Sequence, residues 1–174
     1  MILRLSLSIL FAALLLIGCG GPKTLNPEGE VFFKQNSPQY QLITLKAVSA
    51  NETKSVESGY MPQDKVTGYM EQKVASLLAE NSTGNSPVSV SIDLNYERVF
   101  SWGISSSLAT IKYYADVTLK EGKGVLGVYK VGGNVADKSI AGDFKTMFAD
   151  NKPKDENPYF DYIAQQIVEG LPKK

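Results

Sequence analysis

The residues of this chain with the clearest chemical potential lie near its N-terminus, where the only cysteine, Cys19, follows Leu16-Ile17-Gly18. A cysteine reacts as its thiolate, so this position is suited to covalent modification. It comes after Arg4 and an apolar run over residues 5–17, and this order is typical of a secretory signal. The run is shorter than the roughly 20 apolar residues that span a bilayer. We therefore expect residues 1–18 to be a cleaved signal peptide.

The stretch Leu16-Ile17-Gly18-Cys19 resembles the bacterial lipobox, Leu-x-Gly-Cys. The resemblance implies that Cys19 becomes the first residue of the mature protein and carries several acyl chains, and stable anchoring takes more than one. Gly20 stands where an Asp favours inner-membrane retention in Gram-negative lipoproteins, so the resemblance implies the periplasmic face of the outer membrane. Glycine and proline are frequent over residues 20–29, which predicts a flexible lipidated tether at 19–30 with a reach of roughly 35 Å.

Composition indicates a folded domain and excludes several classes of partner. The chain is 43% hydrophobic and has a formal net charge of zero, which favours a packed core over disorder. A neutral balance argues against binding to nucleic acid and against electrostatic adhesion to an anionic surface. There are no histidines, and lipidation of Cys19 leaves no free thiol, so no disulfide can form within the monomer. The core alone must therefore hold the fold together.

Hydrophobic periodicity predicts a single α+β domain over residues 31–174. Apolar residues that alternate with polar ones indicate strands, and apolar residues at three- and four-residue steps indicate helices. The predicted strands cover residues 41–48, 88–96, 108–119 and 125–132, and the predicted helices cover 64–81 and a segment that begins at Asn157-Pro158. The polar stretch 49–59 is predicted to be a loop. This order predicts a two-layer α+β domain, an antiparallel meander sheet with two helices packed on one face.

The strictest alternation belongs to the strand at 88–96. Its apolar side chains are Val88, Val90, Ile92, Leu94 and Tyr96, with polar residues between them. Period two places one face of such a strand against a core and the other toward water. The helical stripes consist of Val66, Met70, Val74 and Leu77 and of Phe160, Ile163, Ile167 and Leu171. Both helices can therefore cover the apolar face of the sheet.

Short motifs that suggest enzyme chemistry have simpler structural interpretations. The stretch 122–127 matches G-x-G-x-x-G, but a strand follows where the dinucleotide fingerprint needs a helix, so it is interpreted as a hairpin turn. The carboxylate pairs Asp137/Asp143 and Asp155/Glu156 are interpreted as solvated loop residues rather than a general acid and base. The acidic stretch 150–157 lacks the spacing of a calcium loop. We predict no catalytic residue, no metal site and no cofactor, and therefore no enzyme.

The segment that links the two longest strands holds the only tryptophan and offers two interpretations. In the first, which we favour, the segment is a wide hairpin whose aromatic side chains fold back over the sheet. In the second, it is an exposed apolar tip that contacts a partner or the bilayer, because binding hot spots favour tryptophan. The candidate contact residues are Phe100, Trp102 and Ile104.

With the lipobox, the meander and the terminal helix, the chain resembles the small outer-membrane lipoproteins of Gram-negative bacteria. The likeness is to the YajG-like type and, more loosely, to the lipopolysaccharide-assembly lipoprotein family. It implies a membrane-anchored, non-enzymatic accessory or scaffold of a cell-envelope complex, with the membrane and an envelope protein as partners. The alternative is a periplasmic ligand-binding module for a lipid or glycan, with a cleft between sheet and helices. The residues that such a cleft would use are Tyr69, Tyr96, Tyr113 and Tyr129, for which packing in the core is the favoured interpretation.

Overall fold

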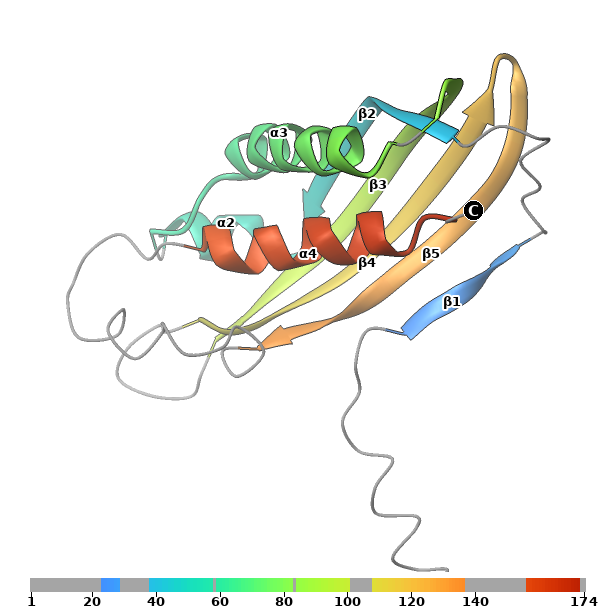
Figure 1. Ribbon diagram of the computed structural model, residues 1–174. Coiled ribbons are helices and arrows are strands. Elements are labelled where there is room, and N and C mark those ends of the chain that lie inside the picture. Colours follow the sequence, from blue (N-terminus) through green and yellow to red (C-terminus); the bar gives the residue numbers. More distant parts are fainter. Residues whose placement is uncertain are drawn as a thin grey trace, which may run out of the picture.

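The computed structural model describes residues 23–28, 38–57, 59–82, 84–100, 108–136 and 156–172. In chain order the elements are β1 (Lys23–Glu28), β2 (Pro38–Ser49), α2 (Glu52–Glu57), α3 (Gln63–Asn81), β3 (Ser86–Phe100), β4 (Leu108–Glu121), β5 (Gly124–Ala136) and α4 (Asn157–Glu169). The strands form one sheet in the order β1-β5-β4-β3-β2, and α3 and α4 lie together across one of its faces (Figure 1). The predicted two-layer α+β fold is confirmed.

The sheet contains the predicted meander and is extended on both sides of it. β3, β4 and β5 pair with their neighbours in antiparallel register. β2 pairs with β3 in parallel, because α3 carries the chain back across the sheet before β3 begins. β1 pairs with β5 in antiparallel register at the other edge. The sheet is therefore mixed, with an antiparallel meander at its centre.

The turn between β4 and β5 explains the glycine-rich stretch at 122–127. Gly122 has a φ of 57°, a left-handed conformation that glycine adopts without a steric penalty. Glu121 and Gly124 face each other at the ends of the two strands and close the hairpin. The segment that follows is β5 and not a helix. The interpretation of this motif as a hairpin turn is confirmed.

The prediction of a flexible tether over residues 19–30 does not hold for Lys23–Glu28, which form β1. Lys23 faces Gly132 and Glu28 faces Val128 on β5, with a register shift between Leu25 and Glu28. Pro27 lies inside that shift, where its missing N–H interrupts no regular ladder position. Backbone pairing with the edge of β5 forms this strand, and the glycine and proline content of the segment gives no sign of it.

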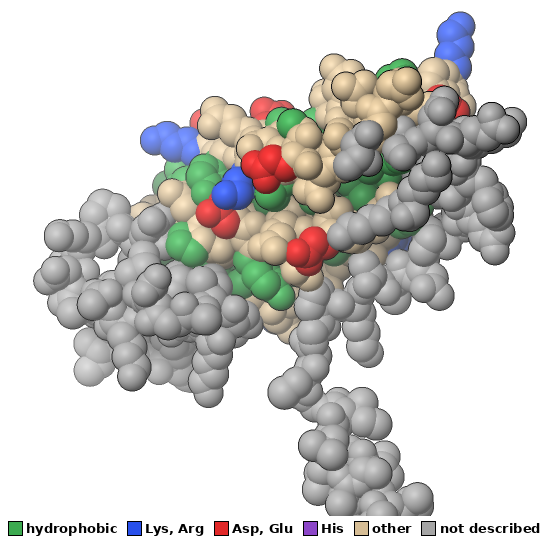
Figure 2. All heavy atoms as spheres, viewed as in Figure 1, with side chains coloured by type: hydrophobic (Ala, Val, Ile, Leu, Met, Phe, Trp, Pro, Cys, Tyr) green, Lys and Arg blue, Asp and Glu red, His purple; other side chains and the backbone are tan. Residues whose placement is uncertain are grey.

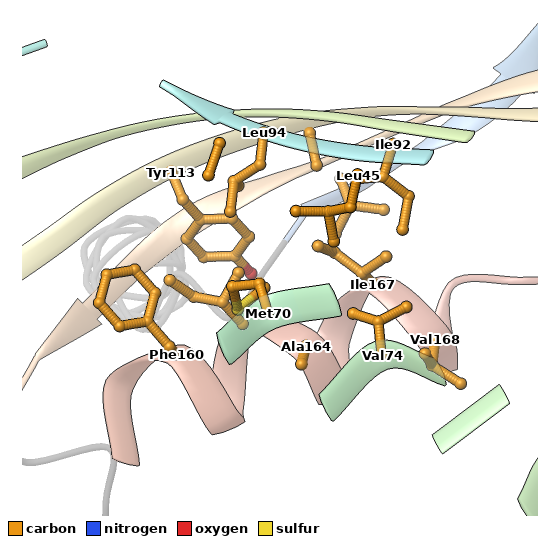
Figure 3. Packing of buried hydrophobic residues seen from close by; sticks show 14 of the residues in the cluster. Leu45, Met70, Val74, Ile92, Leu94, Tyr113, Phe160, Ala164, Ile167 and Val168 are labelled. Carbon is orange, nitrogen blue, oxygen red and sulfur yellow. The ribbon is translucent and has the colours of Figure 1, made fainter. Parts of the chain in front are cut away.

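The core lies between the sheet and the two long helices. In Figure 3, side chains from β2, β3 and β4 meet those of α3 and α4 in one layer, for example Ile92 and Leu94 against Met70 and Ile167. The predicted stripes are buried: Val66, Met70 and Val74 on α3, and Phe160, Ile163, Ile167 and Leu171 at the C-terminal helix and its end. Leu77 is half-buried and its neighbour Leu78 is buried instead. Of the helices described, none has the length and apolarity that a membrane span needs.

The outer surface of the helical layer is mixed in character. Figure 2 shows side chains of both charges lying between small hydrophobic patches on this side of the molecule. Lys73 on α3 and Asp161 on α4 form an ion pair at 3.2 Å, with each side chain about two-fifths exposed. The Tyr69 hydroxyl donates to the same carboxylate at 2.6 Å. These contacts join the two helices at the surface above their buried stripes.

One local expectation differs from the structure. The stretch 49–59, predicted to be a loop, contains the short helix α2, whose Ser55 hydroxyl donates to the Asn51 carbonyl at 2.8 Å. The last helix, α4, begins at Asn157 as predicted, with Glu156 at the cap position and Pro158 in the first turn. The Glu156 side chain makes no capping hydrogen bond. Its hydrogen bonds are made instead to Arg98 and Met61.

The outer edge of β2 is protected near both of its ends and at a bulge between them. The Tyr40 N–H donates to the Ser82 hydroxyl and the Ser49 N–H donates to Gln63 Oε1, both at 2.9 Å. Between them the register against β3 shifts at Ile43, a bulged and 54% exposed residue. Bulges and capped amides hinder the addition of a further strand. This edge is therefore poorly suited to strand-to-strand docking.

The faces of β3 can be tested with two neighbouring substitutions. Ile92 is 2% exposed in the core, so Ile92→Ala should lower the free energy of unfolding by about 2–5 kcal/mol through lost burial and a residual cavity. Ser91→Ala, on the opposite face, should change it by no more than about 0.5 kcal/mol. Urea denaturation of a soluble form measures both, and equal small effects would contradict the assigned faces.

Candidate functional site

The inward face of β3 ends in a charged residue. The buried positions Val88, Val90, Ile92, Leu94 and Tyr96 are followed, in the same period of two, by Arg98. Its side chain is 0% exposed. A buried guanidinium is costly unless a counter-charge and hydrogen bonds compensate it. The end of the sheet where β3 ends and β4 begins, which we call the loop end, therefore holds the most strongly constrained polar group among the described residues.

The counter-charge is Glu156, just before α4. Arg98 Nε donates to Glu156 Oε2 at 2.7 Å and Nη2 donates to Oε1 at 2.8 Å, a bidentate arrangement. Arg98 Nη2 also donates to the Met61 carbonyl at 2.9 Å, and the Met61 N–H donates to Glu156 Oε1 at 2.8 Å. One pair of side chains thus joins β3, the connection before α3 and the start of α4.

Aromatic rings surround the guanidinium. Its central carbon lies 5.1 Å from the ring centre of Tyr96, 5.7 Å from that of Tyr60 and 5.9 Å from that of Phe160. Tyr96 and Phe160 pack edge to face with their ring centres 5.4 Å apart. Arg98 Nη1 is buried and has no hydrogen-bond partner among the described residues. Attraction between the guanidinium cation and these ring faces offsets part of the free-energy cost of burying this nitrogen without a hydrogen bond.

Glu156 was expected to be a solvated loop carboxylate, and this expectation is wrong: the residue is 1% exposed. Burial raises the pKa of Glu156, while the hydrogen bonds and charge of Arg98 and the Met61 N–H lower it and offset part of that rise. Both carboxylate oxygens already accept hydrogen bonds from these two residues. The Glu156 carboxylate is therefore well placed to hold the loop end together and poorly placed to transfer a proton.

A second set of hydrogen bonds supports the pair from the side of β2 and α2. The Asn51 side chain donates to the Arg98 carbonyl at 2.7 Å and accepts from the Arg98 N–H at 3.3 Å. Glu52 Oε1 accepts from the Gln63 N–H at 2.6 Å, which satisfies a free donor at the start of α3. The starts of α2 and α3 are thereby linked to each other and to the end of β3.

Phe100, the last residue of β3, lies at the rim of this cluster. Its ring centre is 5.4 Å from that of Tyr60, at an angle of 45°, and Lys54 Nζ lies 5.4 Å from the same ring. Phe100 is half-buried, and Val56 on α2 is 44% exposed. Of the three candidate contact residues, the structure therefore places Phe100 at the loop end. Trp102 and Ile104 lie outside the described residues, as does Cys19.

The four tyrosines considered for a ligand cleft mostly belong to the core. Tyr96, Tyr113 and Tyr129 are 2–5% exposed, and Tyr69 is half-buried. Burial raises the pKa of Tyr96 and of Tyr113 to about 12. The favoured interpretation, packing in the core, agrees with this burial.

Comparison with models of known protein families and with curated protein sequences finds no match to this chain. Within the described ranges, no three His, Cys, Asp or Glu side chains gather closely enough to hold a metal ion. The Arg98–Glu156 pair was not among the residues predicted from the sequence. Continuation of the period-two pattern of β3 through Arg98 was the available signal, because it directs that side chain into the core.

The pair can be tested by removing its cation. Arg98→Met should lower the free energy of unfolding by about 3–5 kcal/mol near neutral pH, since it leaves Glu156 buried and uncompensated. Burial raises the pKa of Glu156 in the folded state. Loss of Arg98 removes the main influence that lowers this pKa. The penalty is therefore absent below the unfolded-state pKa, grows as pH rises from that value to the folded-state pKa, and is constant above it. Denaturation at several pH values should show the deficit shrinking on acidification.

A matched control is the exposed ion pair Lys112–Glu97, with 3.6 Å between charged atoms. Lys112→Met should cost no more than about 1 kcal/mol. Combining Arg98→Met with Glu156→Met should recover part of the loss of the single Arg98 variant, because no charge is left buried. A deficit that is independent of pH, or a double variant less stable than the single, would contradict the assignment.

Tyr113 gives a separate test of core packing against ligand lining. Its hydroxyl is buried with no hydrogen-bond partner in the described part of the chain. Tyr113→Phe should therefore leave stability unchanged or raise it by about 1 kcal/mol. Tyr69→Phe, which removes a 2.6 Å hydrogen bond to Asp161, should lower it by about 1–3 kcal/mol. Thermal melts compare the two, and a clear loss in Tyr113→Phe would argue for a partner of that hydroxyl.

Proposed function

We propose that this protein is a membrane-anchored lipoprotein on the periplasmic face of the outer membrane, acting as a non-enzymatic accessory or scaffold of a cell-envelope complex. The observation that carries the proposal is the sequence Leu16-Ile17-Gly18-Cys19. The fold supports it, because β1 begins at Lys23 and belongs to the sheet. A lipid on Cys19 therefore holds the whole domain close to the membrane.

The surface that best fits a protein partner is the sheet face opposite α3 and α4. No described helix covers it (Figure 1). Its exposed side chains include Asp93, Asn95, Lys112 and Lys120. Near its centre, Tyr114 is 37% exposed. An added Cβ on the facing Gly132 would lie 3.3 Å from the Tyr114 ring, so the ring rests against this glycine. A fixed, exposed tyrosine within a polar surface is a typical binding anchor.

The two competing functions receive less support. Catalysis by the buried carboxylate of Glu156 is disfavoured because Arg98 and Met61 already occupy both of its oxygens. A ligand-binding module for a lipid or glycan would need a cleft lined by tyrosines. Tyr96, Tyr113 and Tyr129 are instead packed in the core. Docking of a protein on the open face of the sheet is therefore the favoured activity.

Purification of the lipidated protein from cross-linked native membranes, followed by mass spectrometry, tests the docking proposal. We expect an envelope protein to be recovered with the wild type and to be depleted at least tenfold with Tyr114→Ala, the loss for an anchor of about 2 kcal/mol. Lys123→Ala, in the exposed β4–β5 turn, is the control and should recover the partner normally. Repeated recovery of no envelope protein by the wild type would contradict the accessory role.

The anchor is tested by Cys19→Ser. Formation of the thioether needs a thiolate nucleophile, and a serine hydroxyl is far weaker. The variant should therefore carry no lipid and should retain its signal peptide. Mass spectrometry of the N-terminal fragment checks both, and a variant with the same lipid mass as the wild type would show that the lipobox assignment is wrong.

A further inference from the structure

The position of β1 in the sheet limits which part of the domain can meet the bilayer, an inference that rests on the proposed lipid anchor at Cys19. Lys23 faces Gly132 on β5. From Gly132, β5 continues for four residues to Ala136 at the loop end, about 13 Å away. In the other direction, Gly124 at the hairpin is eight residues away, about 26 Å.

The chain between the anchor and β1 is short. Cys19 precedes Lys23 by four residues, so their Cα atoms can be no more than about 14 Å apart. This reach is sufficient for Cys19 to lie level with Ala136 at the loop end. It is about half the distance along β5 to Gly124 at the hairpin. If the strands stand upright on the membrane that holds the lipid, only the loop end of the sheet can therefore lie at its surface.

The described surface of the loop end has the chemistry of a membrane-contacting rim. Val56 on α2 is 44% exposed, and Phe100 at the end of β3 is half-buried. Lys54 Nζ, also on α2, lies 5.4 Å from the Phe100 ring. An apolar side chain and an aromatic ring can enter the interfacial region while the ammonium group remains near lipid phosphates. The buried Arg98–Glu156 pair supports this rim from the core side, through the contacts of Arg98 with Asn51 and Tyr60.

We propose that the loop end, through α2 and Phe100, docks on the phospholipid surface into which the Cys19 lipid inserts. The strands then rise from the membrane, and β3, with 15 residues, extends about 50 Å away from it. The open face of the sheet with Tyr114 stands beside the bilayer and remains accessible to an envelope protein. The β4–β5 hairpin is the part of the described domain farthest from the membrane.

Single labels at the two ends of the sheet test this orientation in the full-length lipidated protein. Val56→Cys places an environment-sensitive fluorophore at the loop end, and Lys123→Cys places it in the exposed hairpin turn; Cys19 does not react because its sulfur carries the lipid. The protein is reconstituted in phosphatidylethanolamine–phosphatidylglycerol vesicles that contain a nitroxide-labelled phospholipid. We expect the Val56→Cys label to be quenched several-fold more strongly than the Lys123→Cys label.

A third variant separates docking from mere proximity. A flexible insert of about ten residues between Pro22 and Lys23 adds roughly 33 Å of reach, and retained quenching of the Val56→Cys label shows that the rim itself binds lipid. Equal quenching at both ends, or loss of quenching with the insert, overturns the proposal. The proposal is also overturned if the Val56→Cys label is shielded in native membranes but unquenched in vesicles. That result would identify a protein, and not lipid, as the partner that covers the loop end. If mass spectrometry finds an N-terminal fragment without lipid, the proposed anchor at Cys19 is overturned as well. If the protein is lipidated but its Val56→Cys label is not quenched, only the docking of the loop end is overturned.

Discussion

A charge buried beneath aromatic rings sets the structure of the loop end. Arg98 lies on the core face of β3, where every preceding buried residue is apolar, and it is held there by Glu156 from the start of α4. The two residues are 58 positions apart. The two members of a buried ion pair must stay in contact, because either charge left buried without its partner strongly destabilises the fold. The positions of α4, Met61 and the end of β3 therefore depend on one another.

This constraint connects the core to the part of the molecule nearest the proposed lipid. α2 and Phe100 are fixed by contacts that lead back to Arg98, through Asn51 in one case and Tyr60 in the other. β1 begins only four residues after Cys19 and is part of the same sheet. With the proposed lipid on Cys19, the pairing of β1 would leave little free chain between the membrane and the sheet. The proposed accessory role would benefit from this geometry, since the binding face would be presented at a restricted angle to the membrane.

Hydrophobic periodicity in the sequence predicted the helices and strands that bury one face of their side chains. It did not predict features that depend on backbone pairing or on a partner residue far away in the sequence. The alternation from Val88 to Tyr96 and the stripe from Val66 to Val74 gave β3 and α3, because burial of one face is a local pattern. β1 is formed by pairing with the edge of β5, which leaves no side-chain pattern around Pro27. Glu156 sits among charged neighbours in the sequence, and nothing local indicates that its partner is Arg98.

The most direct test of the central claim, that the Arg98–Glu156 pair fixes the loop end, is residue-resolved amide hydrogen exchange at Met61. Its N–H donates to Glu156 Oε1 at 2.8 Å and can exchange only when that contact opens. We predict that the Met61 amide exchanges as slowly as core amides of β3 such as Leu94. Exchange as fast as that of Lys123 in the exposed hairpin turn would contradict it, because the pair would then be open much of the time.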